Sequence, residues 1–128
     1  MAADVVLLVD DDPSVREMTC MLLEYAGYSV LLAGSAAEAM AQTAAHPEIG
    51  VVVTDVNLRE GPNGFEMARA MKAAGLSAAM IIISGDPSWQ EASQANDMHF
   101  LAKPYASATL MQAIAAGCSQ HQQAHRVE

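Results

Sequence analysis

Short, mostly aliphatic runs alternate with segments of helical periodicity along this chain. The runs are bounded by turn-forming residues, which predicts strands at residues 5–9, 28–32, 51–54, 80–83 and 99–102. Between and after them, apolar side chains recur with the spacing of an α-helix, which predicts helices at residues 13–25, 35–46, 64–74, 87–95 and 106–117. Alternation of this kind is typical of an α/β fold.

The first helix has the clearest boundaries. Asp12 is suited to the N-cap and Pro13 to the first helical position, and Gly27 is suited to the C-terminal end. The apolar residues that share one face of this helix are Val15, Met18, Leu22 and Tyr25.

Because the predicted strands are apolar throughout, they favour a parallel sheet covered by helices on both faces. Right-handed crossovers then predict a doubly wound, flavodoxin-like fold with five helices and the strand order 2-1-3-4-5. In this order the topology switches between the first and third strands, and ligands bind at their carboxyl ends. The sequence shows no repeat or linker, so we expect one domain over residues 1–118 and a polar C-terminal tail over residues 119–128.

Composition narrows the function classes. The chain has 128 residues, of which 52% are hydrophobic, and a formal charge of −9, which argues against disorder and against a nucleic-acid partner. No apolar run is long enough for a membrane helix, and the N-terminus has no basic segment of the secretory type. Cys20 and Cys118 have no metal-binding or redox spacing. We therefore expect a cytoplasmic protein with reduced thiols and no membrane partner.

Polar residues stand at four predicted strand ends. They are Asp10, Asp11 and Asp12 after the first strand, Asp55 after the third, Ser84 after the fourth and Lys103 after the fifth. Each has an ordinary structural explanation by itself, as a helix cap, a turn or a surface lysine, and for Asp12 the cap is the better interpretation. Together they are informative, because parallel strands bring these ends to one edge of the sheet.

Crowding at this edge predicts a cation site. Asp10, Asp11 and Asp55 would repel one another and raise one another's pKa values. A hard divalent cation held by oxygen ligands, with Lys103 as a further positive charge, would neutralise them. Such a site suits a dianionic phosphoryl group.

At this point the sequence resembles the receiver-domain family of response regulators, which act in two-component phosphorelays. The resemblance rests on four motifs: Val9 to Asp11, Asp55 after an apolar strand, Ser84 with Gly85, and Lys103 to Tyr105. It implies that Asp55 accepts a phosphoryl group from the phosphohistidine of a histidine kinase or a histidine phosphotransfer protein. It also implies that Mg²⁺ or Mn²⁺ is held by Asp10, Asp11, Asp55 and the backbone carbonyl of Asn57.

The resemblance assigns the remaining residues to catalysis and switching. Lys103 and Ser84 would contact the phosphoryl group, and Ser84 with Phe100 would switch the surface of the fourth helix, fifth strand and fifth helix toward an unspecified downstream protein. The Lys103–Pro104 peptide is expected to be cis. Such a protein catalyses its own phosphorylation and dephosphorylation and is not otherwise an enzyme.

Dephosphorylation needs a water in line with the acyl phosphate bond. Asn57 and Asp86 follow Asp55 and Ser84 by two residues each, and both are small and polar, so they are expected to admit and orient this water. The alternative for Asp86 is a cap of the fourth helix, which begins near Pro87.

The sequence departs from the family pattern at two places. The loop after Asp55 is slightly longer than usual and carries Arg59 in place of a proline, which resembles receivers attached to hybrid histidine kinases. The segment from Ser84 to Lys103 is shorter than in chemotaxis-type receivers, which predicts a trimmed fourth helix.

Two other functions share part of this pattern of residues. The first is a pseudo-receiver that serves as a phosphorylation-independent interaction module, although every residue required for phosphorylation is present. The second is a phosphatase of the haloacid-dehalogenase type, which also uses a motif like Asp10-x-Asp12, a serine and a lysine. That family needs an acid pair after the lysine, and none follows Lys103.

Overall fold

The computed structural model describes residues 4–126, with side chains described as far as His121. Five parallel strands form one sheet in the order β2-β1-β3-β4-β5, which confirms the predicted fold class and strand order. The strands are β1 (Val5–Val9), β2 (Ser29–Ala33), β3 (Ile49–Asp55), β4 (Ala79–Ser84) and β5 (His99–Ala102).

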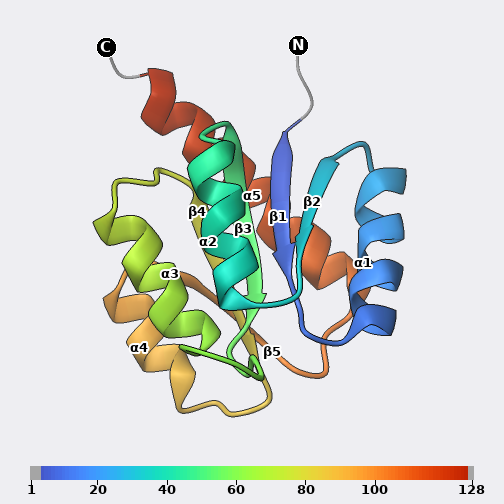
Figure 1. Cartoon of the computed structure of the whole chain (residues 1–128). Helices are drawn as coiled ribbons and strands as arrows, with labels where there is room; N and C mark the ends of the chain where they lie inside the picture. The colour runs from blue at the N-terminus through green and yellow to red at the C-terminus, as the bar shows by residue number, and fades with distance from the viewer. Residues whose placement is uncertain (1–3, 127–128) are drawn as a thin grey trace.

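Helices cover both faces of the sheet (Figure 1). On one face lie α2 (Ala36–Ala45), α3 (Gly64–Ala73) and α4 (Trp89–Ala95), and on the other lie α1 (Pro13–Tyr25) and α5 (Ser107–Arg126). Alternate residues of β3 supply the two cores: Val52 packs with the α2 and α3 side chains, and Val51 and Val53 pack with those of α5. The fully apolar pattern of β3 and β4 is therefore explained by burial on both faces.

Helix α1 begins as predicted but turns an apolar face to solvent. The Asp12 carboxylate accepts hydrogen bonds from the Ser14 and Val15 amides at 3.0 and 3.4 Å, which confirms its role as the N-cap. Leu23 is the buried residue of α1, because the side of the helix that it occupies faces the sheet. The opposite side carries an exposed apolar surface, which we call the α1 stripe: Val15, Met18, Met21, Leu22 and Tyr25.

Helix α5 is longer than predicted. The expected helix end at Gly117 is wrong, since α5 continues to Arg126, and the predicted division at residue 118 therefore falls inside a helix. Gly117 has a packing role instead: a Cβ there would lie 3.1 Å from the Ala79 Cβ and 3.2 Å from a Val51 methyl group. The missing side chain lets α5 approach β3 and β4 closely.

Candidate functional site

The carboxyl ends of the strands surround an acidic pocket of about 330 Å³. The strand arrows in Figure 1 point toward this edge of the sheet. The lining residues are Asp10, Asp11, Asp12, Val15, Asp55, Asn57, Arg59 and Lys103. The structure therefore brings together the four aspartates and the lysine that the sequence placed at this edge.

Asp55 and Lys103 form an ion pair at the base of this pocket. Asp55 ends β3 and is 9% exposed, and its Oδ2 accepts a hydrogen bond from the Lys103 Nζ at 2.5 Å. Burial by itself would lower the pKa of Lys103, but the hydrogen bond and negative charge of Asp55, with the charge of Asp10, raise it instead. Lys103 therefore stays cationic beside the carboxylate.

Asp10 and Asp11 have different surroundings. The Asp10 Oδ1 accepts a hydrogen bond from the Asp12 amide at 2.9 Å, but burial outweighs this bond and raises the pKa of Asp10, with contributions from the charges of Asp55 and Asp11. Asp11 has a cationic partner, since its Oδ2 lies 3.4 Å from the Nε of Arg59. Of these three aspartates, Asp55 and Asp11 therefore have cationic partners, and the ionisation of Asp10 is opposed by its surroundings.

Arg16 is a structural residue of the site that the sequence analysis did not single out. Its Nη1 donates to the backbone carbonyl of Asp10 at 2.7 Å, from the first turns of α1. A Cβ on Gly34 would approach this Nη1 to 2.9 Å, so the glycine leaves room for the arginine. Arg16 thus fixes the turn that presents Asp10 and Asp11, and only the three-dimensional path of the chain reveals it.

Gly64 holds the loop that follows Asp55. Its amide donates to the Val56 carbonyl at 2.8 Å, which closes the loop of residues 57–63 onto the end of β3. A Cβ on Gly64 would collide with the Asp55 backbone carbonyl oxygen, so this approach requires glycine. Asn63 then caps α3 through a reciprocal pair of hydrogen bonds with Glu66. The loop that carries Asn57 and Arg59 is therefore anchored at both ends.

Ser84 lies next to the pocket and not among its lining residues. It ends β4, is 2% exposed, and its backbone carbonyl accepts a hydrogen bond from the Lys103 amide at 2.9 Å. Its Oγ accepts a hydrogen bond from the Asp86 amide at 3.0 Å. The predicted cis peptide between Lys103 and Pro104 is present. Ser84 thus links Lys103, which directly follows β5, to the turn before α4.

Asp86 lies in the turn between Ser84 and α4, and Phe100 lies in the neighbouring strand β5. The Asp86 Oδ1 accepts from the Ser88 amide at 3.0 Å, and this hydrogen bond lowers the pKa of Asp86. Since α4 begins at Trp89 with Ser88 as its N-cap residue, the predicted start near Pro87 is wrong, and Asp86 forms a turn ahead of the helix. Phe100 is half-buried in β5 and packs against the core on the α4 side.

The donor set suits a hard divalent cation. Mg²⁺ is usually bound through one or two carboxylates and keeps several waters, so an open pocket lined by four aspartates and the Asn57 loop fits its chemistry. Over residues 4–121, no group of three or more histidine, cysteine or acidic side chains is placed to hold a metal ion by itself, so a cation here would need waters or backbone oxygens as further ligands. Burial is the main cause of the raised pKa of Asp10, and the charges of Asp55 and Asp11 add to it; a cation in the pocket would oppose these charge effects.

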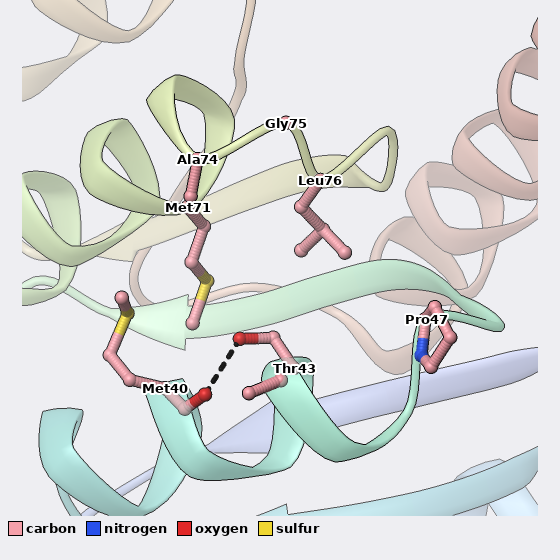
Figure 2. Close-up of a pocket in the computed structure, with 8 residues that line it drawn as sticks. Met40, Thr43, Pro47, Met71, Ala74, Gly75 and Leu76 are labelled. Atoms are coloured by element: carbon pink, nitrogen blue, oxygen red, sulfur yellow. Dashed lines mark hydrogen bonds between the residues drawn. The ribbon is translucent and has the colours of Figure 1, made fainter.

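A second pocket of about 380 Å³ lies between α2 and α3. Figure 2 shows Met40 and Met71 pointing toward each other across it, with Thr43 hydrogen-bonded to the Met40 carbonyl and Pro47 and Leu76 at the far end. Its lining has no charged residue, so the acidic pocket is the better candidate for phosphoryl chemistry. Within the described part of the chain, no helix has the length and apolar character needed to span a membrane.

Comparisons with known proteins agree with this geometry. The model of the response regulator receiver domain family matches residues 6–115. The transcriptional regulatory protein FixJ of Azorhizobium caulinodans is 32% identical over 124 residues, which cover 94% of this chain and 58% of that protein. The chain therefore spans less than two thirds of this relative.

Solved structures share the fold. A response regulator receiver domain protein from Clostridium thermocellum is 25% identical with a TM-score of 0.87, and the match covers 94% of this chain and 98% of that one. The response regulator TrrA from Thermotoga maritima, solved in complex with Mg²⁺-BeF, is 20% identical with a TM-score of 0.80 over 89% of this chain and 98% of that one. At that identity the second match shows the fold alone.

Proposed function

Since the chain belongs to the response regulator receiver domain family of two-component signalling, we propose that Asp55 is its phosphoacceptor. The observation that supports this best is the ion pair of Asp55 with Lys103 at the base of an acidic pocket. Asp55 is the one lining carboxylate that ends a central, fully buried strand and has an ammonium partner. A phosphohistidine of a histidine kinase or histidine phosphotransfer protein is the proposed donor.

The transfer uses groups that the pocket already holds. An Asp55 carboxylate oxygen attacks phosphorus, the P–N bond of the phosphohistidine breaks, and its electron pair returns to the imidazole nitrogen. Charge spreads over the phosphoryl oxygens during transfer, and Lys103 is placed to stabilise it. We expect Asp10, Asp11, Asp55 and the Asn57 carbonyl to hold Mg²⁺ or Mn²⁺, which would supply further positive charge; the oxygen-rich lining of the open pocket supports a hard divalent cation. The domain would thus catalyse its own phosphorylation.

Phosphorylation would then change the contacts of Lys103 and Ser84. Once Asp55 is an acyl phosphate, Lys103 turns from the carboxylate to a phosphoryl oxygen. The Ser84 hydroxyl now accepts a hydrogen bond from the Asp86 amide, and it would donate to another phosphoryl oxygen. Movement of Ser84 alters the turn before α4, and Phe100 repacks beside it. The α4, β5 and α5 surface is the proposed output.

The α1 stripe is the proposed docking surface for the phosphodonor protein. Val15 belongs both to this stripe and to the lining of the acidic pocket, so the apolar surface continues to the site where phosphate must be delivered. Five large apolar side chains exposed on one short helix form a patch of the kind that proteins use for association. A pseudo-receiver, which takes no phosphoryl group, gives no reason for an exposed α1 stripe to lie next to an acidic pocket with every residue required for phosphorylation.

The downstream pathway belongs to the same proposal. FixJ is a transcriptional regulatory protein, so output through a DNA-binding partner or domain is compatible with this family. That this domain itself contacts no nucleic acid stays a prediction based on its formal charge of −9, and a cytoplasmic location likewise stays a prediction.

Labelling with acetyl phosphate and Mg²⁺ tests the phosphoacceptor assignment. We expect one base-labile phosphoryl group in the unmodified protein, none in Asp55→Asn, and normal labelling in Asp12→Asn. The second variant removes the same charge from the pocket but keeps a good N-cap. Labelling that survives Asp55→Asn would place the nucleophile elsewhere, and an unlabelled parent protein with an intact kinase partner would favour the pseudo-receiver.

A further inference from the structure

Arg59 is the second cation of the acidic pocket, and the proposed function gives it no role. It lies in the loop between β3 and α3, its side chain is 78% exposed, and its Nε is 3.4 Å from the Asp11 Oδ2. Asp11 is one of the expected metal ligands. The cation and the metal would therefore compete for the same carboxylate.

The Arg59–Asp11 contact has the properties of an exchangeable pair. Exposed ion pairs are weak, because water screens the charges and ordering a long side chain costs entropy. The loop that carries Arg59 is closed at its base by the hydrogen bond from Gly64 to Val56, so the guanidinium remains near the pocket when it leaves Asp11. The anchored loop thus limits how far the Arg59 guanidinium can move from the pocket.

Charge at the pocket supports a second position for this arginine. Four aspartates, one lysine and one arginine line it, a formal charge of −4 + 2 = −2, which one divalent cation neutralises. A dianionic phosphoryl group that then enters makes the pocket negative again. A guanidinium offers a planar pair of N–H donors that matches two phosphoryl oxygens, and it is no longer held by Asp11.

We propose that Arg59 is a positioning residue that exchanges partners: it pairs with Asp11 in the metal-free pocket and with the donor's phosphoryl group once a divalent cation occupies Asp11. This deepens the proposed function and rests on it, since it assumes phosphoryl transfer at Asp55. The exchange weakens metal binding in the resting protein and strengthens binding of the phosphodonor in the loaded one. Loss of the arginine therefore changes the two affinities in opposite directions.

Arg59→Ala and Arg69→Ala form a matched pair for the test. Arg69 is exposed on α3 and does not line the pocket, so both variants lose one positive charge but only one loses it at the site. For Arg59→Ala we expect the Mg²⁺ dissociation constant, measured by isothermal titration without phosphodonor, to fall about two- to fivefold, the size of an exposed ion pair. The concentration of acetyl phosphate that gives half the maximal labelling rate at saturating Mg²⁺ should rise by a similar factor. Arg59→Lys should restore the Mg²⁺ dissociation constant of the parent protein. It should lower the required acetyl phosphate concentration only part of the way, because an ammonium lacks the planar pair of N–H donors of a guanidinium.

The two measurements separate the possible outcomes. If Arg59→Ala binds Mg²⁺ no more tightly than Arg69→Ala, or needs no more acetyl phosphate, the exchange is refuted while phosphorylation of Asp55 stands. If the parent protein is not labelled on Asp55 at all, the proposed function fails and the exchange with it, even when the titration shows tighter Mg²⁺ binding. Opposite shifts in the two constants, confined to Arg59→Ala, support the exchange.

Discussion

Replacing Gly64 by alanine should destabilise the protein, because the added Cβ has no room against the end of β3. The Cβ of alanine would collide with the Asp55 backbone carbonyl oxygen and lie 2.7 Å from the Thr54 Oγ1. Both atoms belong to the end of β3, a strand buried along its whole length, so neither can move aside as an exposed side chain would. The start of α3 must shift instead, and that shift breaks the 2.8 Å hydrogen bond from the Gly64 amide to Val56.

The magnitude follows from these two losses. Overpacking a buried position costs about 1–3 kcal/mol. A lost backbone hydrogen bond adds about 0.5–1.5 kcal/mol. We therefore expect the free energy of unfolding to fall by about 2–4 kcal/mol, which for a domain of this size lowers the melting temperature by roughly 10 °C.

Urea unfolding followed by circular dichroism measures this loss, and Gly85→Ala provides the control. A Cβ on Gly85 meets no atom within 4 Å, so that variant should stay within about 1 kcal/mol of the parent protein. At temperatures where Gly64→Ala is folded, its labelling by acetyl phosphate should be slow, because the displaced loop carries Asn57 and Arg59. A Gly64→Ala protein as stable as Gly85→Ala would refute the account of the loop closure.

Three further predictions concern charge, water and docking. Burial raises the pKa of Asp10 above 3.8 in the folded state, so its contribution to stability is present at low pH and is lost as pH rises through the folded pKa. Asp10→Asn should therefore raise the melting temperature at neutral pH without Mg²⁺ but not below pH about 4, while weakening Mg²⁺ binding in titrations. Asn57→Met and Asp86→Leu should slow the loss of phosphate from labelled protein several-fold, and unchanged rates in both would end the water-access hypothesis. Met18→Asp, at a 73% exposed position of the α1 stripe, should slow phosphotransfer from a cognate kinase about tenfold, the effect of losing roughly 1.4 kcal/mol, with acetyl phosphate labelling as the unaffected control.

The strands and the polar residues at their ends were predictable because both depend on short-range pattern. Burial on both faces makes β3 and β4 apolar throughout, and a parallel sheet then places every strand end at the same edge. Asp10, Asp55 and Lys103 could thus be grouped from their positions in the chain. Their distances and the direction of each pKa shift required coordinates, since these depend on side-chain placement.

The sequence was ambiguous where an apolar or small residue had two possible roles. Helix α1 is apolar on two sides, and periodicity cannot decide which side faces the sheet; Leu23 does, while Met18 and Tyr25 lie in solvent. Gly117 resembled a helix end but serves close packing of α5 against β3. Arg16 and Gly64 were not singled out, because their roles depend on segments that meet only in the folded protein.

The contacts around Lys103 explain how one charge change at Asp55 can reach a distant surface. In the resting pocket Lys103 pairs with Asp55 and Arg59 pairs with Asp11, while burial raises the pKa of Asp10. Converting Asp55 to an acyl phosphate necessarily removes the carboxylate to which Lys103 is bound. The Lys103 amide is bonded to the Ser84 carbonyl, and the Ser84 hydroxyl to the Asp86 amide at the start of the turn before α4. A phosphoryl group on Asp55 would offer acceptors to the Lys103 ammonium and to the Ser84 O–H. These two residues are joined through the Lys103 amide and the Ser84 carbonyl, and the Ser84 hydroxyl also accepts from the turn before α4, which is exposed and therefore the part least held in place by burial.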